Sequence, residues 1–513
     1  MAIIFTNTDR RVVPNWKSFS KTAHLGELNS FNKEKNISSY SLIEYIDDWK
    51  LNKTVPFAGD LLSAAISNNQ IGLLEVRDAA KFILENRNDS TISQKSLASA
   101  ILNSKIQTTE QQIDEINDEN LFDCILSIEQ IYAKIAKLKQ RIIAYPYNPI
   151  LYVELSRYYI SIGQAEHAII AINKALFLGK NNRFILRSAA RLYLHLKDKE
   201  QALHVLRRSE LTKNDPWLLA SEISISSMIK KNSNNIKRGL NIIDSSNFSF
   251  ASVSELASSI GTLEYINGAN KKSKKLFHKS LIEPNDNSLA QAEWAASKSL
   301  IQDSDLLNIH SLPKNSFYES CALSSFNRKE YNNSIRFASD WIEDMPFAKR
   351  PILFASSIST THLKKYDLSE KILKIGLQAN PFDAQLINNI AYACALNDEL
   401  EKADNYLAQI KSNFIIDKST EICLLATKGL INFRKGFNDS GRELYLQAIE
   451  KTNEFKDSPS LNWTAVLNYA REELRANPLA KEKISPLVSK IKDSLIDEDT
   501  KVLKNDVMKL LQE

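Results

Sequence analysis

Glycine is scarce in this sequence, at 12 of 513 residues, roughly 2% against a usual share of about 7%. An all-β fold needs glycine for its tight turns, and a phosphate-binding loop needs it so that the backbone can approach the ligand. The low share therefore disfavours both and favours a helical protein. Long apolar runs are missing as well, because no stretch approaches the about 18 apolar residues of a membrane-spanning helix.

Charge and cysteine content exclude several further classes. There are 66 Lys and Arg against 61 Asp and Glu, a net charge of +5, which is too small to indicate nucleic-acid binding by itself. The N-terminal residues place a short apolar run before the basic ones, the reverse of a secretory signal. We therefore expect a cytoplasmic protein with no membrane insertion. The cysteines are far apart, so neither a disulfide framework nor a metal site is expected: Cys124, Cys321, Cys394 and Cys423.

The sequence motifs of common enzyme classes are absent. No GxGxxG, GxxxxGK[ST], HExxH or GxSxG pattern occurs. The seven histidines never recur at a spacing of three or four residues, so no two of them share a helical face as metal ligands would. These absences favour a protein that is not an enzyme and that holds neither a metal nor a cofactor.

Helical periodicity runs through most of the chain, and its changes divide the chain into four parts. Residues 1–40 lack it and are expected to form an extended N-terminal arm. Residues 146–475 are expected to form an array of repeats. Residues 476–513 are expected to form amphipathic helices that cap the last repeat of this array. Residues 41–145 are expected to form a helical N-terminal domain, because apolar residues return every three or four positions, as at Leu42, Tyr45, Ile46 and Trp49.

An internal repeat with a period of 34 residues begins after Tyr145. Tyr159 returns as Tyr193, and Ala168 returns as Ala202. A fixed period at which large and small residues return in phase is typical of a repeat architecture. The small residues allow two helices to approach closely, whereas the large ones fill the space between units.

This pattern resembles the tetratricopeptide repeat, a helix–turn–helix unit of 34 residues. Gly163 in the first copy and Lys197-Asp198 in the second stand where such a unit turns. Another strong copy stands at 387–410, and further copies fit around 260–284, 318–346 and 425–448. The resemblance implies an all-α fold, an α-solenoid of helix–turn–helix repeats, over residues 146–475. It says little about function, because one solenoid fold serves many roles.

The resemblance also implies where ligands bind, since the first helix of each unit lines the concave surface in this family. Arg157, Arg187, Arg191 and His195 occupy such positions. The last three recur every four residues and so share one helical stripe. Guanidinium groups facing one groove suit a carboxylate, an acidic peptide or a phosphate. A solvated face with local pairing is the alternative.

A second candidate set stands at the matching positions of a later copy. Asn388, Asn389 and Tyr392 would present side-chain amides and a phenol to the groove, and amides can clamp the backbone of an extended peptide. Solubility or bonding between repeats is the alternative. The densest basic run, at 271–275, is expected to be a charged outer face, with nucleic-acid contact as its alternative.

We therefore expect a non-enzymatic scaffold or adaptor subunit that holds a segment of a protein partner in its concave groove, within a larger hetero-complex. A bacterial multi-gene system is one setting for such a complex. The first alternative is a regulator that senses a peptide or small anion in the Arg157, Arg187 and Arg191 groove. The second is a helical-repeat protein that binds nucleic acid, which the small net charge makes less favoured.

Overall fold

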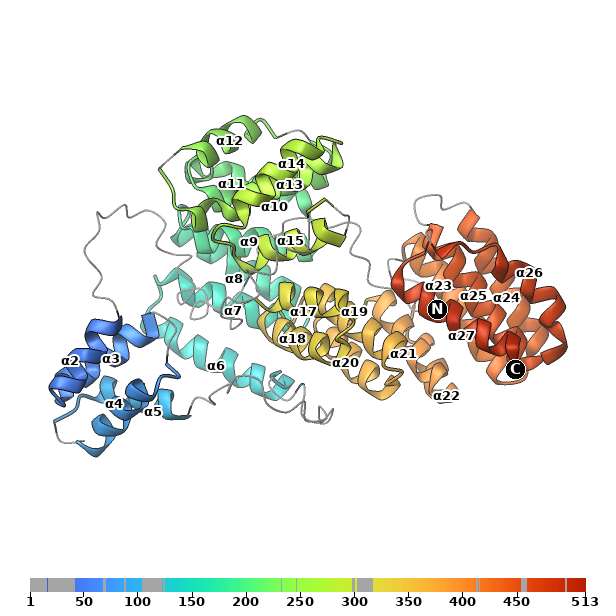
Figure 1. Cartoon of the computed structure of the whole chain (residues 1–513), viewed down its shortest axis with the longest axis horizontal. Helices are drawn as coiled ribbons and strands as arrows, with labels where there is room; N and C mark the ends of the chain where they lie inside the picture. The colour runs from blue at the N-terminus through green and yellow to red at the C-terminus, as the bar shows by residue number, and fades with distance from the viewer. Residues whose placement is uncertain are drawn as a thin grey trace. The chain divides into compact units, whose positions relative to one another are not determined.

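The structure is a computed structural model of the chain. It describes residue 16 and residues 42–513 except 68–70, 87–88, 104–121, 123–124, 232, 246, 298–299, 302–316, 412–413, 415, 454–458 and 494–495. The expected arm at 1–40, apart from Trp16, and Cys124 thus lie outside the described residues. Helices connected by turns and loops make up the described chain, and none of its described helices combines the length and apolar composition needed to cross a membrane (Figure 1).

The chain divides into two compact units, one of residues 23–116 and one that joins residues 1–22 to 117–513. The smaller unit contains four helices in its described part, and its own apolar core includes Trp49, Leu61 and Ile83. Trp49 lies edge-on to Phe82, with 5.2 Å between the ring centroids. The helices are α2 (Leu42–Leu51), α3 (Val55–Ser67), α4 (Leu74–Glu85) and α5 (Ile92–Asn103).

The larger unit begins at α6 (Ile128–Ala144), which the sequence analysis had assigned to the N-terminal domain. The Ser127 hydroxyl and the Gln130 side chain form a capping box at the start of this helix, which satisfies backbone N–H groups that have no partner within the helix. Helix α6 then packs against α7. Residues 128–144 therefore belong with the array rather than with the smaller unit.

The remaining helices pair with their neighbours in the chain. They are α7 (Pro149–Ser161), α8 (Ala165–Leu178), α9 (Arg183–His195), α10 (Lys199–Arg208), η1 (Glu210–Lys213), α11 (Pro216–Met228), α12 (Ile236–Asp244), α13 (Phe250–Ile266), α14 (Asn270–Ser280), α15 (Asp286–Ser297), α17 (Tyr318–Asn327), α18 (Tyr331–Asp344), α19 (Lys349–Ser357), η2 (Ile358–His362), α20 (Tyr366–Ala379), α21 (Ala384–Leu396), α22 (Leu400–Leu407), α23 (Lys418–Arg434), α24 (Asn438–Asn453), α25 (Pro459–Ala476), η3 (Pro478–Ala480), α26 (Lys481–Ser489) and α27 (Glu498–Gln512).

Eight described hairpins of the array, from α7–α8 to α23–α24, each turn at a residue with a left-handed backbone. At the α9–α10 turn this residue is Lys197, with φ 65°, and the N–H of Asp198 donates to the Tyr193 carbonyl at 2.9 Å. This bond satisfies a carbonyl at the end of α9, as in a Schellman motif. Glycine takes the same position at only three of the described turns, and lysine or aspartate at the others: Gly163, Lys197, Lys230, Gly268, Lys329, Lys364, Asp398 and Gly436. The chain therefore makes a series of turns with few glycines.

Small residues twelve positions apart let the two helices of a hairpin approach. The Ser156 hydroxyl donates to the Ala168 carbonyl at 2.8 Å, and Ser334 does the same to Ala322 at 2.8 Å. The Ser273 hydroxyl donates to the Gly261 carbonyl at 2.7 Å. The same crossing thus recurs from hairpin to hairpin, and the all-α fold of helix–turn–helix repeats is confirmed.

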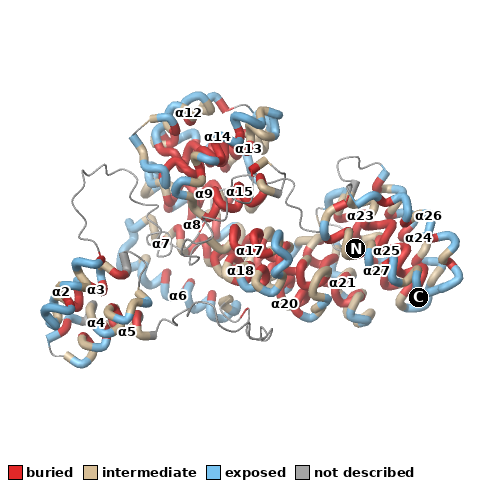
Figure 2. The backbone as a smooth tube through the Cα atoms, in the orientation of Figure 1, coloured by how far each residue is buried: buried red, intermediate tan, exposed pale blue. Residues whose placement is uncertain are grey.

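The array also folds back on itself. Gly163, at the turn of the first hairpin, lies against Pro381 and Gln378 at the end of α20, and α7 packs against α20. Helix α27 likewise contacts η2 and α25, where the Asp499 carboxylate accepts a hydrogen bond from the Ser357 hydroxyl at 2.7 Å. Buried residues accordingly continue through the larger unit (Figure 2).

Candidate functional site

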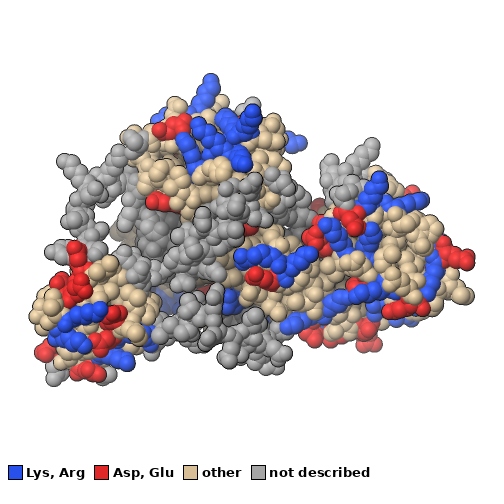
Figure 3. Space-filling model, viewed as in Figure 1, with Lys and Arg blue, Asp and Glu red and all other residues tan. Residues whose placement is uncertain are grey.

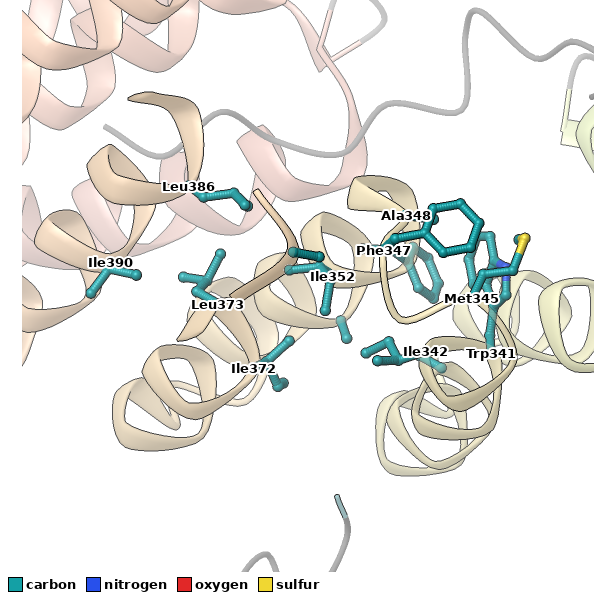
Figure 4. Close-up of a cluster of buried hydrophobic side chains, with 14 of the residues drawn as sticks. Trp341, Ile342, Met345, Phe347, Ala348, Ile352, Ile372, Leu373, Leu386 and Ile390 are labelled. Atoms are coloured by element: carbon teal, nitrogen blue, oxygen red, sulfur yellow. The ribbon is translucent and has the colours of Figure 1, made fainter. Parts of the chain in front are cut away.

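The connection between α18 and α19 brings together side chains from distant parts of the larger unit. Phe347 stands at its centre and is fully buried. Its ring centroid lies 5.4 Å from that of Trp16 and 5.2 Å from that of His195, and the Arg191 guanidinium carbon lies 5.6 Å from it. Figure 4 shows Phe347 close to Met345 and Trp341 at the end of α18. We call Trp16, Arg157, Arg191, His195 and Phe347 the closure cluster.

Arg157 enters this cluster from α7. Its Nη2 donates to the backbone carbonyl of Asp344 at 2.7 Å, and the residue is only 7% exposed. The connection therefore links two hairpins that are 187 residues apart in the sequence. Since the acceptor is a carbonyl, this hydrogen bond leaves the positive charge of Arg157 uncompensated.

Burial dominates the electrostatics of Arg191 and His195. It lowers the pKa of Arg191 to about 10, and the nearby Glu319 carboxylate opposes that shift. Burial also lowers the pKa of His195 to about 3, and the positive charges of Arg191 and Lys349 lower it further. His195 is therefore neutral at neutral pH, so the positive charge at this end of the cluster belongs to Arg191.

Arg187 lies on the same helix but points elsewhere. Its Nη1 is 3.0 Å from a carboxylate oxygen of Glu255 and donates to the Trp217 carbonyl at 3.2 Å. Its guanidinium also covers the Trp217 ring at 5.1 Å. Both charges of the ion pair are buried. The predicted groove set is thus separated, because Arg157 and Arg191 meet the 344–347 connection while the charge of Arg187 is neutralised by α13.

The second predicted set lies inside the protein. Asn388 and Asn389 are buried on α21, and the Tyr392 hydroxyl donates to the amide oxygen of Asn468 at 3.0 Å. Helix α21 is buried around almost its whole circumference because α20, α22 and α23 all pack on it. This placement differs from the expected open groove surface, and peptide binding by these residues stays a prediction.

One group of metal-ligand side chains occurs among the described residues, and the sequence analysis missed it. Glu370, Cys394 and Glu399 bring their ligand atoms within 4.8 Å of one another. The Lys402 ammonium donates to Glu370 at 2.6 Å and to Glu399 at 2.8 Å. Burial and the Glu370 charge raise the pKa of Cys394 to about 12. An internal cation therefore already compensates these carboxylates, and the thiol stays protonated.

Exposed lysines gather over α12 and α14 on the face shown in Figure 3. Lys271, Lys274 and Lys275 are exposed on α14. Two neighbours are held by carboxylates, Lys272 by Glu264 and Lys279 by Asp244. Part of the positive charge on this face is therefore compensated locally. The buried residues of α14 include Leu276 and Phe277.

No protein-family model matches the sequence, and no curated protein matches it. Solved structures match at low sequence identity. The yeast Tom70 structure is 14% identical, covers 77% of this chain and 95% of its own, and has a TM-score of 0.31. The human IFIT1 dimer with m7Gppp-AAAA is 12% identical, covers 77% and 97%, and scores 0.34. Naa15/Naa10 bound to HypK-THB is 14% identical, covers 89% and 88%, and scores 0.22.

Proposed function

We propose that the chain is a non-enzymatic cytoplasmic scaffold, an adaptor subunit that binds two protein partners within a larger complex. The larger unit offers its helical array to one partner, and the smaller unit offers the surface of α2–α5 to another. Recognition uses many weak contacts along successive hairpins rather than a chemical step.

The observation that carries this proposal is the division of the chain into two units with separate apolar cores. A unit with its own core keeps its surface when the other unit is engaged. The smaller unit exposes large apolar side chains whose exposure does not stabilise its own fold. Ile43 is 68% exposed, Leu51 79% and Leu74 82%. Such residues supply the apolar contacts at the centre of protein interfaces.

Affinity purification of the full-length chain from its native host tests the proposal. A triple variant with Ile43, Leu51 and Leu74 each replaced by Glu should lose one partner and retain the other. Leu479→Glu is the comparison on the larger unit, where Leu479 is 88% exposed, and it should leave the partner of the smaller unit bound. Identical partner sets for wild type and the triple variant would contradict binding through the smaller unit. Recovery of no partner at all would contradict the scaffold role.

The exposed lysines of α14 support nucleic-acid binding as a second candidate function. A chain that neutralises phosphates through these lysines should lose affinity steeply as salt is raised. Replacing Lys271, Lys274 and Lys275 by Gln should remove most of that salt dependence for a single-stranded RNA or DNA probe. Binding that is unchanged in this variant would contradict the role of this face.

A further inference from the structure

A cavity lies where the first hairpin of the array meets the middle hairpins. Its volume is 180 Å³, somewhat larger than the about 150 Å³ apolar cavity that holds a benzene molecule. Residues from α6, α7, α20 and the α18–α19 connection form its walls. Apolar and polar side chains both contribute to the wall. Ile125, Leu126, Ile131, Pro346 and Ile375 are apolar, whereas Tyr158, Ser161 and Gln378 bring polar atoms.

Arg157 also lines this cavity and carries an unused hydrogen-bond donor. Its Nε is buried and has no hydrogen-bond partner, while its Nη2 is occupied by the Asp344 carbonyl. An unsatisfied buried donor on a charged group is unfavourable, and native proteins rarely leave one. The Arg157 guanidinium, 7% exposed, is also without an ion pair among the described residues. A ligand that carries a negative charge and accepts a hydrogen bond from the guanidinium would compensate this buried charge.

The remaining charges at the cavity indicate how much negative charge such a ligand brings. Lys134 stands at the wall with an exposed side chain, and Glu343 contributes the one carboxylate. Two cations against one anion leave a net charge of about +1 for the site. The carboxylate of a monoanion matches this balance, and Arg binds carboxylates with directed hydrogen bonds. A phosphate dianion would overcompensate the charge and would meet the apolar wall.

We propose that this cavity binds a small monocarboxylate with an apolar body of about six to ten non-hydrogen atoms. The carboxylate accepts a hydrogen bond from the Arg157 guanidinium, and the apolar body packs between Ile131 and Ile375. Because Arg157 belongs to α7 and Ile375 to α20, the ligand holds the first and middle hairpins together. The site belongs to the larger unit and uses no residue of α2–α5.

The test uses the full chain and compares acids with neutral analogues of the same shape. Benzoate and hexanoate should raise the melting temperature by about 2–3 °C at a concentration 100 times the Kd, whereas benzamide and hexanamide should not. A tetrapeptide ending in phenylalanine, with a free or an amidated C-terminus, shows whether the carboxylate comes from a peptide end. A shift only with the free peptide would assign the same site to that source.

Three variants make the result specific. Arg157→Met should abolish the shift, and Ile375→Phe should abolish it by filling the cavity while Arg157 remains. Arg328→Met removes an exposed arginine, which is 3.3 Å from Glu330, and should behave as wild type. If Arg157→Met fails to fold, Ile375→Phe still decides the matter. No shift with any carboxylate, or an equal shift in wild type and Ile375→Phe, would overturn the proposal.

Discussion

The contact between the first hairpin and the middle of the array can be measured with one matched pair of substitutions. Gly163 and Gly268 both occupy left-handed turns, with φ 71° and 82°. Adding a Cβ at Gly268 meets nothing within 4 Å, whereas a Cβ at Gly163 would lie 2.9 Å from Pro381 Cδ. The two glycines thus share the backbone requirement and differ in the long-range contact.

The expected free-energy changes follow from this difference. An alanine in a left-handed conformation costs about 1–2 kcal/mol, and the reduced entropy of the unfolded chain offsets about 0.4–1 kcal/mol of it. Gly268→Ala should therefore cost about 1 kcal/mol. Gly163→Ala carries the same cost plus about 1–3 kcal/mol for crowding against Pro381.

Urea denaturation followed by circular dichroism gives the free energy of unfolding for both variants. Hydrogen exchange then locates the difference, because Gly163→Ala should speed exchange at the end of α20 and Gly268→Ala should not. Equal destabilisation by the two substitutions, with no change in exchange at the end of α20, would refute the packing of the first hairpin on α20.

Three further results are expected. Arg187→Met should lower the free energy of unfolding by about 3–5 kcal/mol, because it leaves the buried Glu255 carboxylate uncompensated. Adding Glu255→Met should restore part of that loss in a urea titration. Additive losses from the two substitutions would contradict the ion pair. The pKa of His195 lies at about 3, below its ordinary value of about 6.5. Between these two pH values the unfolded chain binds a proton at His195 and the folded chain does not. The free energy of unfolding therefore falls as the pH drops through this window. His195→Gln should therefore reduce the loss of stability between pH 7 and pH 5 by about 2 kcal/mol, while His204→Gln on the exposed face of α10 should leave it unchanged. Equal losses in wild type and His195→Gln would contradict the assignment. Asp499→Ala removes the acceptor of two hydrogen bonds to the region before α20 and should cost about 2–3 kcal/mol, seen as faster hydrogen exchange in α27; unchanged exchange there would count against its docking on η2.

The hairpins could be predicted from the sequence because their causes are local. Ala168 and Ala202 return with the period at which helices must cross closely, and Lys197 stands where the chain must turn. Residues that repeat in phase indicate contacts between helices that follow one another in the chain. The turn at Lys197 was therefore predicted even though glycine is absent there.

The surroundings of the candidate site could not be predicted, because they depend on contacts with no periodic signal. Arg157 was expected to face an open groove, yet its partner carbonyl at Asp344 lies 187 residues away. Arg187 likewise pairs with Glu255, which belongs to a different hairpin. Both contacts join hairpins that are not neighbours in the chain, and the pattern of a single repeat does not encode them.

Native mass spectrometry of the tagged full-length chain, purified gently from its host, tests the scaffold role most directly. The chain alone has a mass of 58.1 kDa. The scaffold account predicts a heavier species that contains at least one different polypeptide and that loses a subunit when Ile43, Leu51 and Leu74 are replaced by Glu. A single species with the mass of the tagged chain alone, in wild type and variant alike, would contradict it.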